Sequence, residues 1–163
     1  MSSGPYCDGK LATIYVKNGK IVGGDFNGVT YTGTLFGTSG PDVIVGTEAR
    51  DVIRGMSGMD TLCGLGGDDD IDAGSLDDRV FGGEGNDRIV GGSENDVVCG
   101  EGGNDTLRGD SADNDKVDGG PGTDSADGGS GIADTCAAES TVNCESVVPS
   151  ISDCNTKIIL NVP

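Results

Sequence analysis

The sequence predicts an all-β fold, a right-handed parallel β-roll of two-stranded coils of 18 residues, with an N-terminal β-hairpin cap and a short C-terminal tail. Two observations predict it. Residues 82–108 read GGEGNDRIV, GGSENDVVC and GEGGNDTLR, which are three nine-residue units in one register. The chain also combines 31 glycines and 4% aromatic residues with a net charge of −18. This composition is too poor in large apolar side chains for an ordinary core, whereas a fixed repeat indicates a stacked architecture.

Residues 1–36 are predicted to form the N-terminal cap. Residues 11–17 and 20–22 flank Asn18 and Gly19, and an Asn-Gly pair supplies the two positive φ angles of a type I′ turn. We therefore expect a β-hairpin here.

Residues 37–137 hold the repeat array, which has eleven units. Each unit begins with a glycine-rich turn, places an aspartate sixth and an apolar residue eighth. The sixth-position residues are Asp42, Asp51, Asp60, Asp69, Asp78, Asp87, Asp96, Asp105, Asp115, Asp124 and Asp134. The eighth-position residues are Ile44, Ile53, Leu62, Ile71, Val80, Ile89, Val98, Leu107, Val117, Ala126 and Cys136. Residues 28–36 place Leu35 eighth but lack the aspartate, as expected of a terminal unit.

Residues 138–163 leave the repeat and are predicted to form a C-terminal flank. Residues 147–149 and 157–162 are apolar enough to suggest a short terminal strand.

The unit also predicts the geometry of one coil. Its last three residues form a short strand whose middle side chain points inward, because side chains alternate along a strand. Two units, or 18 residues, close one coil, and neighbouring coils lie about 4.8 Å apart. Serine recurs at the third position of every other unit, at Ser39, Ser57, Ser75, Ser93, Ser111 and Ser130, with 18 residues between neighbours except for 19 across the last insertion.

The turns carry the chemistry. Glycines at the first, second and fourth positions allow the backbone to curl so that carbonyl groups face a common centre, to which the sixth aspartate adds a carboxylate. Two turns stacked one coil apart offer an all-oxygen cage, which suits Ca²⁺ better than Mg²⁺. The carbonyl ligands expected in the most regular turns belong to Gly64, Gly66, Gly82, Glu84, Gly100 and Gly102.

The unit G-G-x-G-x-D-x-U-x, where U is a large aliphatic residue, resembles the calcium-binding repeat of the RTX (repeats-in-toxin) family. The resemblance implies several bound Ca²⁺ ions and a ligand role for all eleven sixth-position aspartates. The cysteine-bearing ends around Cys7, Cys136 and Cys144 are also similar to those of short secreted bacterial RTX proteins.

Alternate units fall on opposite edges of the predicted roll. The consensus edge carries Asp51, Asp69, Asp87, Asp105 and Asp124, in mostly regular turns. The serine edge carries the six other sixth-position aspartates. On the serine edge Leu76, Glu94 and Ala112 replace the fourth glycine, which puts the tight turn in doubt. We therefore expect the serine edge to bind metal more weakly.

The six cysteines predict disulfides, because the chain has no histidine and no CxxC pair for zinc. Cys63 and Cys99 lie two coils apart, about 9.5 Å, beyond the disulfide limit of about 7 Å. Cys7 is a candidate partner for one of them and Cys154 for the other, and Cys136 and Cys144 are candidates to close a small loop at the end of the array. Six cysteines allow 15 pairings, and the sequence does not choose among them. Disulfides favour an extracellular location.

Val45 and Phe81 occupy the same outward row as Cys63 and Cys99. An exposed apolar row is usually covered. We expect the N-terminal hairpin or the C-terminal tail to lie over it; the alternative is a protein or glycan partner at Val45 and Phe81 or through the tail.

The function predicted from these features is a secreted, non-catalytic calcium-binding β-roll that folds when Ca²⁺ binds. The absence of histidine excludes Ser-His-Asp and His-zinc catalysis. The acidic composition argues against nucleic acid, and the chain has no apolar run long enough for a membrane span. The alternatives are an adhesion, matrix-binding or glycan-binding module, or a fragment that accompanies a larger secreted enzyme.

Overall fold

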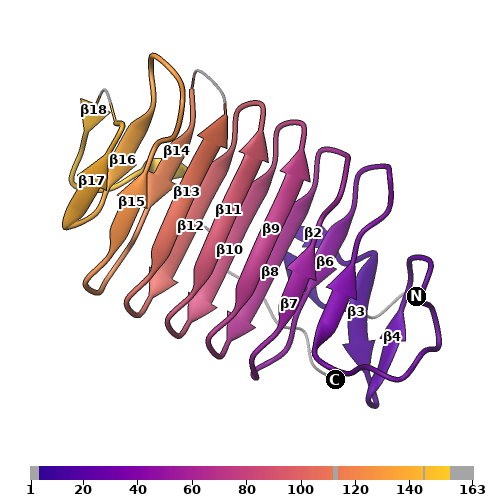
Figure 1. The fold of residues 1–163 in the computed structure, drawn as a ribbon. Helices are drawn as coiled ribbons and strands as arrows, with labels where there is room; N and C mark the ends of the chain where they lie inside the picture. The colour runs from indigo at the N-terminus through magenta and orange to yellow at the C-terminus, as the bar shows by residue number, and fades with distance from the viewer. Residues whose placement is uncertain (1–3, 112–113, 145, 155–163) are drawn as a thin grey trace.

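The computed structural model describes residues 4–111, 114–144 and 146–154. These residues form an all-β solenoid whose parallel coils repeat about every 18 residues (Figure 1). The 3-10 turn η1 (Ser152–Cys154) is the one helical element among them, and no helix of the described part is long and apolar enough to cross a membrane.

Two sheets run along the solenoid, one on each side. The first sheet has nine strands in the order β18 (Ser146–Val147), β16 (Thr135–Ala137), β14 (Lys116–Asp118), β12 (Val97–Gly102), β10 (Arg79–Glu84), β8 (Thr61–Gly66), β6 (Val43–Val45), β3 (Ile14–Lys17) and β4 (Lys20–Val22). The second has seven strands in the order β17 (Ser140–Val142), β15 (Ser125–Asp127), β13 (Thr106–Ser111), β11 (Arg88–Ser93), β9 (Asp70–Ser75), β7 (Val52–Arg54) and β5 (Thr34–Phe36). From β4 onward, consecutive strands therefore alternate between the sheets, as a two-stranded coil requires.

The predicted hairpin is present and caps the nine-stranded sheet. Strands β3 and β4 pair antiparallel around Asn18 and Gly19, whose φ angles are 52° and 70°. Strand β3 then pairs in parallel with β6, the first strand of the array on that side. Strand β5, with Leu35 fully buried, caps the seven-stranded sheet by pairing with β7.

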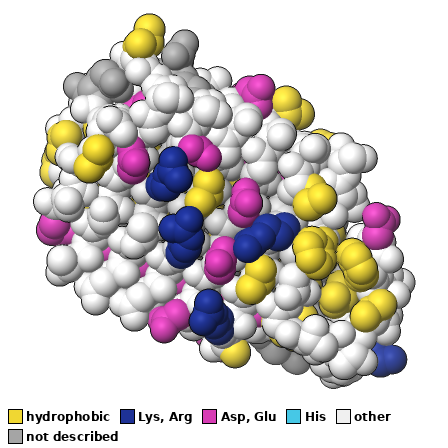
Figure 2. Space-filling model, viewed as in Figure 1, with side chains coloured by type: hydrophobic (Ala, Val, Ile, Leu, Met, Phe, Trp, Pro, Cys, Tyr) yellow, Lys and Arg dark blue, Asp and Glu magenta, His cyan; other side chains and the backbone are white. Residues whose placement is uncertain are grey.

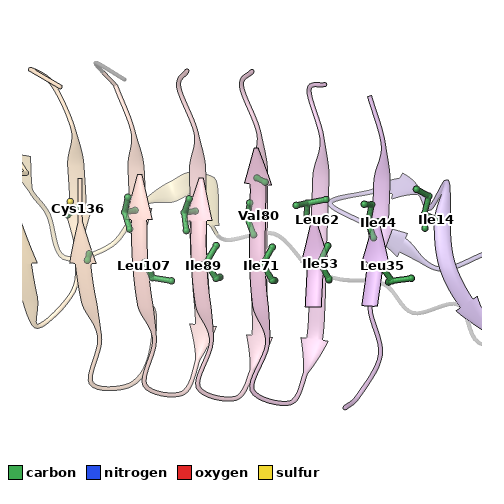
Figure 3. Close-up of a cluster of buried hydrophobic side chains, with 14 of the residues drawn as sticks. Ile14, Leu35, Ile44, Ile53, Leu62, Ile71, Val80, Ile89, Leu107 and Cys136 are labelled. Atoms are coloured by element: carbon green, nitrogen blue, oxygen red, sulfur yellow. The ribbon is translucent and has the colours of Figure 1, made fainter. Parts of the chain in front are cut away.

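The eighth-position side chains form the core between the sheets. They point inward in two facing rows (Figure 3), and each is at most 1% exposed. Because each unit contributes one such side chain, the core is a narrow apolar layer and the turns lie outside it. The inward direction of the eighth position is thus confirmed.

The coil extends further than the predicted array. Strand β17 pairs in parallel with β15, and β18 with β16, so these two strands add another coil. The strand suggested for 157–162 lies outside the described residues.

Two terminal segments, one around Cys7 and the other around Cys154, cover the outer face of the nine-stranded sheet. Disulfides join Cys7 to Cys63 and Cys99 to Cys154, with Cα–Cα distances of 5.9 and 5.6 Å. A third disulfide joins Cys136 to Cys144. The three pairs lie among the candidates that the sequence offered, and the structure decides the connectivity that the sequence left open.

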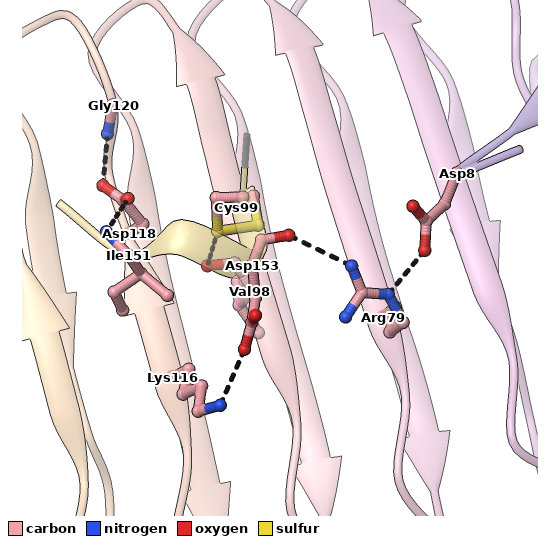
Figure 4. The surroundings of a disulfide bond; sticks show 10 residues. Asp8, Arg79, Val98, Cys99, Lys116, Asp118, Gly120, Ile151 and Asp153 are labelled. Atoms are coloured by element: carbon pink, nitrogen blue, oxygen red, sulfur yellow. Dashed lines mark hydrogen bonds and ion pairs between the residues drawn. A yellow bond between two sulfur atoms is a disulfide. The ribbon is translucent and has the colours of Figure 1, made fainter. Parts of the chain in front are cut away.

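Arg79 lies where the two terminal segments meet (Figure 4). Its Nε donates to Asp8 Oδ2 at 2.7 Å, and its guanidinium donates a second bond to the Asp153 carbonyl at 3.0 Å. Below these segments Val45 is 1% exposed and Phe81 is fully buried. The proposed partner surface at Val45 and Phe81 is therefore wrong, because the chain's own ends cover it.

The outer face of the seven-stranded sheet carries charges of both signs. Arg54 pairs with Asp70 at 3.0 Å, and Arg108 pairs with Asp110 at 2.9 Å. Figure 2 shows the basic side chains lying among acidic ones on the face in view. This face is a solvated, mixed-charge surface rather than a patch of one sign.

Candidate metal sites

The sixth-position aspartates form a ladder along each edge of the solenoid. All eleven are buried, and in the nine that follow Asp42 and Asp51 the Oδ1 atom accepts a hydrogen bond from the backbone N–H of the aspartate one coil earlier. Asp87 Oδ1, for example, accepts from Asp69 N at 2.8 Å, and Asp105 Oδ1 accepts from Asp87 N at 2.8 Å. The serine edge repeats the pattern, with Asp78 N donating to Asp96 Oδ1 at 2.9 Å. The turn sequence thus stacks one carboxylate directly over the next.

The second carboxylate oxygen is buried without a hydrogen-bond donor in eight of these residues. They are Asp60, Asp69, Asp78, Asp87, Asp96, Asp105, Asp115 and Asp124. Within the described part of the chain, none of them forms an ion pair with lysine or arginine. A buried carboxylate oxygen with no donor is costly unless a cation or another partner binds it.

The first-position glycines make room for these oxygens. A Cβ on Gly46 would lie 2.5 Å from Asp51 Oδ2 and 2.6 Å from the Gly64 carbonyl oxygen. A Cβ on Gly82 would collide with Asp87 Oδ2 and lie 2.7 Å from the Gly100 carbonyl oxygen. The carbonyls of Gly64, Gly82 and Gly100 therefore lie close to the Oδ2 atom of the preceding coil. Close approach, rather than unusual φ, explains the glycine at this position.

Positive φ angles occur at the second and fourth positions instead. Gly83 and Gly85 have φ angles of 112° and 133° in a regular turn. On the serine edge Leu76 and Glu94 also have positive φ angles, of 77° and 68°. The loss of the fourth glycine therefore strains these turns without removing their curl. Ala112 lies outside the described residues.

Two turns at the N-terminal end differ from the others. Thr38 and Thr47 stand at the second position, where a β-branched residue disfavours positive φ. The N–H and hydroxyl of Thr38 donate to Asp42 Oδ2 at 2.6 and 2.9 Å, and those of Thr47 donate to Asp51 Oδ2 at 2.6 and 3.1 Å. In these two turns the threonine donates hydrogen bonds to the aspartate Oδ2 atom, which has no donor in the eight residues named above.

Two of the expected third-position carbonyls accept hydrogen bonds from the turn one coil earlier. The Glu84 carbonyl accepts from Gly67 N at 2.9 Å, and the Gly102 carbonyl accepts from Gly85 N at 2.8 Å. Gly66, Glu84 and Gly102 stack in register one coil apart. The structure thus groups the first-position carbonyls with the aspartates and uses two of the third-position carbonyls to join coils.

The electrostatics of the ladders are unfavourable without a countercharge. Burial raises the pKa of Asp69 and Asp78 to about 7 and that of Asp87 to about 6, and neighbouring carboxylates add to the effect. Asp96 is affected most: burial first, then the charges of Asp78, Asp115 and Asp77, raise its pKa to about 8. The folded chain therefore disfavours its own ionised aspartates near neutral pH.

These donors fit a hard cation. Carboxylate and carbonyl oxygens are the ligands that Ca²⁺ takes in proteins. Among the described residues, no group of three or more acidic, cysteine or histidine side chains converges on one point. A site at these edges must therefore combine one or two carboxylates with backbone carbonyls, as the predicted cage does.

Sequence reasoning missed two features of the edges. The fifth position forms a second ladder, in which Asn86 N donates to Asp68 Oδ1 and Asn104 N donates to Asn86 Oδ1. Its signal was the Asn or Asp that precedes each of the six consecutive sixth-position aspartates from Asp69 to Asp115. The second feature is Glu139, which accepts the N–H of Asp124 at 2.8 Å. Glu139 follows Asp124 by 15 residues, so the repeat spacing gives no sign of it.

Comparison with known proteins agrees with this geometry. Residues 36–71, 72–107 and 110–132 match the family model described as the RTX calcium-binding nonapeptide repeat (4 copies). No curated protein matches the chain. The matched segments cover more than half of the sequence and coincide with the aspartate ladders. The chain therefore belongs to the family of RTX calcium-binding nonapeptide repeats.

Proposed function

We propose that this protein is a secreted, non-catalytic β-roll that folds when Ca²⁺ binds between the stacked turns of its two edges. The observation that carries the proposal is the row of buried Oδ2 atoms without hydrogen-bond donors. Bound Ca²⁺ would supply the missing positive charge and accept coordination by the nearby carbonyl oxygens.

Coupling to folding follows from the charge of the two ladders. In the unfolded chain the carboxylates are hydrated and lie far apart. In the folded chain they stack one coil apart in a buried row, which is unfavourable until a cation neutralises them. Because the complete site exists only in the stacked coil, the binding free energy becomes folding free energy.

The hydrogen-bond pattern of the two ladders supports a specific number of Ca²⁺ ions. A complete step of a ladder has a donor-free Oδ2 below and a sixth-position aspartate above. Seven steps meet this condition, those that begin at Asp60, Asp69, Asp78, Asp87, Asp96, Asp105 and Asp115. The steps that begin at Asp42 and Asp51 are excluded because threonine donors occupy their Oδ2 atoms. Stacked aspartates alone would allow nine sites, so the proposal is more restrictive.

Secretion is supported by the three disulfides, which persist in oxidising compartments. Calcium is also abundant outside cells and scarce in the cytosol, so a calcium-dependent fold would form after export. A non-catalytic role is supported by the use of the regular aspartates in the ladders.

The test is a calcium titration of the oxidised protein, followed by far-UV circular dichroism and native mass spectrometry. We expect a cooperative increase in β-structure with Ca²⁺, a much weaker response to Mg²⁺, and several ions retained. A chain with its disulfides reduced that is fully β-folded in excess chelator would refute the coupling. A chain that retains no Ca²⁺ would refute the function itself.

A further inference from the structure

Glu139 occupies the place of a sixth-position aspartate in a further coil, which the repeat spacing does not reveal. Strand β17 pairs with β15 so that Ser140 faces Ser125. The residue before each of these serines is therefore also stacked, which places Glu139 over Asp124. The turn before Glu139 has four residues fewer than a regular turn and the preceding unit has one residue more, so the coil closes after 15 residues instead of 18.

The hydrogen bonds around Glu139 repeat those of the ladder. Asp124 N donates to Glu139 Oε2 at 2.8 Å, as Asp105 N donates to Asp124 Oδ1 at 2.8 Å one coil earlier. Ser140 N donates to the Asp124 carbonyl at 3.1 Å, as Ser125 N donates to the Asp105 carbonyl at 2.9 Å. The longer glutamate side chain thus makes the contact that an aspartate makes at all the other steps of the two ladders.

Asp124 supplies the other half of a site. It is 2% exposed, and its Oδ2 is buried without a hydrogen-bond donor. A Cβ on Gly119, the first residue of the same turn, would lie 2.5 Å from this oxygen. The lower half of the step is therefore built like that of the complete steps.

We infer that Asp124 and Glu139 form an eighth divalent-cation site, which closes the consensus edge at its C-terminal end. The inference rests on the proposed function and adds a ligand from outside the nonapeptide repeat. The shortened turn has one residue, Ala138, between the end of β16 and Glu139. This turn offers fewer carbonyl ligands than a six-residue turn, and Glu139 is exposed. The eighth site should therefore fill last, at higher calcium than the other seven.

The test is the number of Ca²⁺ ions that native mass spectrometry finds on oxidised wild-type protein, Glu139→Gln and Glu94→Gln across a calcium titration. The Glu139→Gln variant keeps an oxygen for the Asp124 N–H and removes the charge. Glu94→Gln is the matched control, because exposed Glu94 also accepts a backbone N–H across one coil, from Leu76 at 3.0 Å, but lies outside the aspartate ladder.

We expect eight ions on the wild type and on Glu94→Gln, and seven on Glu139→Gln, with the weakest ion missing. Glu139→Asp, which keeps the carboxylate, should retain the eighth ion if Glu139→Gln proves poorly folded. Equal counts for the wild type and Glu139→Gln would overturn the inference, and so would the loss of an ion in Glu94→Gln. Either result would leave the seven-site proposal standing, whereas a wild type without Ca²⁺ would refute that proposal instead.

Discussion

Gly82→Ala is expected to remove one metal site while leaving the rest of the ladder in place. The added methyl group would collide with Asp87 Oδ2 and lie 2.7 Å from the Gly100 carbonyl oxygen. Both atoms belong to the step between Asp87 and Asp105. The hydrogen bond from Asp69 N to Asp87 Oδ1 belongs to the step before it, so that site should survive.

The size of the effect follows from linkage. At free calcium about 100-fold above the dissociation constant, one site stabilises the folded state by about 2.7 kcal/mol. The remaining six or seven sites would have to compensate for this lost stabilisation, by about 0.4 kcal/mol each. The calcium concentration at the midpoint of folding therefore rises by only about twofold. The ion count should fall by one, which is the clearer measurement.

Gly40→Ala is the matched control. A Cβ at Gly40 meets no atom within 4 Å, and its φ is not positive. Alanine there should leave the ion count unchanged and, by restricting the unfolded chain by about 0.4–1 kcal/mol, lower the calcium midpoint slightly. Circular dichroism and native mass spectrometry of both variants check this. Identical ion counts and midpoints for the two variants would show that the first-position glycine does not make room for a metal ligand.

Three further outcomes are expected. Thr47→Gly should remove the hydroxyl donor and, because glycine readily adopts positive φ, allow the backbone N–H to turn away from Asp51 Oδ2, which adds one ion in native mass spectrometry. An unchanged count would mean that the threonine does not block that step. In excess chelator, acid should promote folding, because the pKa values of buried aspartates rise from 3.8 to about 6–8 in the folded chain. Protonation of these aspartates stabilises the folded state fully below about pH 4, and the stabilisation is lost as the pH rises through the folded pKa values. Circular dichroism that shows more β-structure at pH 8 than at pH 5 would contradict this expectation. Replacing Cys7 and Cys63 by serine should destabilise the protein by about 4 kcal/mol, because their disulfide spans 56 residues. The same replacement of Cys136 and Cys144, whose disulfide spans 8 residues, should cost about 2.5 kcal/mol. Equal shifts of the calcium midpoint in these two double variants would contradict the chain-entropy reasoning.

The repeat made the central part of this structure predictable. A period of nine with an aliphatic residue eighth leaves one way to bury every such residue, and Ile71, Val80 and Ile89 lie where the period places them. The hairpin was predictable for a local reason, since Asn18 and Gly19 determine the turn without help from the rest of the chain.

The remaining features depend on contacts between coils, which periodicity does not contain. Thr38 and Thr47 look like harmless replacements of glycine, yet a change of backbone angle redirects their N–H groups onto the aspartates. The sequence spacing hid Glu139 because its coil is three residues shorter than the others, although the strand pairing continues through it. The pairing of Cys7 with Cys63 rather than Cys99 depends on where the terminal segments cross the sheet.

The two long disulfides also determine how this protein would carry a mechanical load. Tension applied to the chain before Cys7 and after Cys154 passes through the sulfur atoms to Cys63 and Cys99. The polypeptide within each of the two loops, which span 56 and 55 residues, is bypassed. Only the segment from Cys63 to Cys99, two coils in the middle of the roll, lies in the line of force. Covalent bonds would thus shield the coils at both ends from stretching, and the force needed to extend the protein would be decided by the turns around Asp69, Asp78, Asp87 and Asp96.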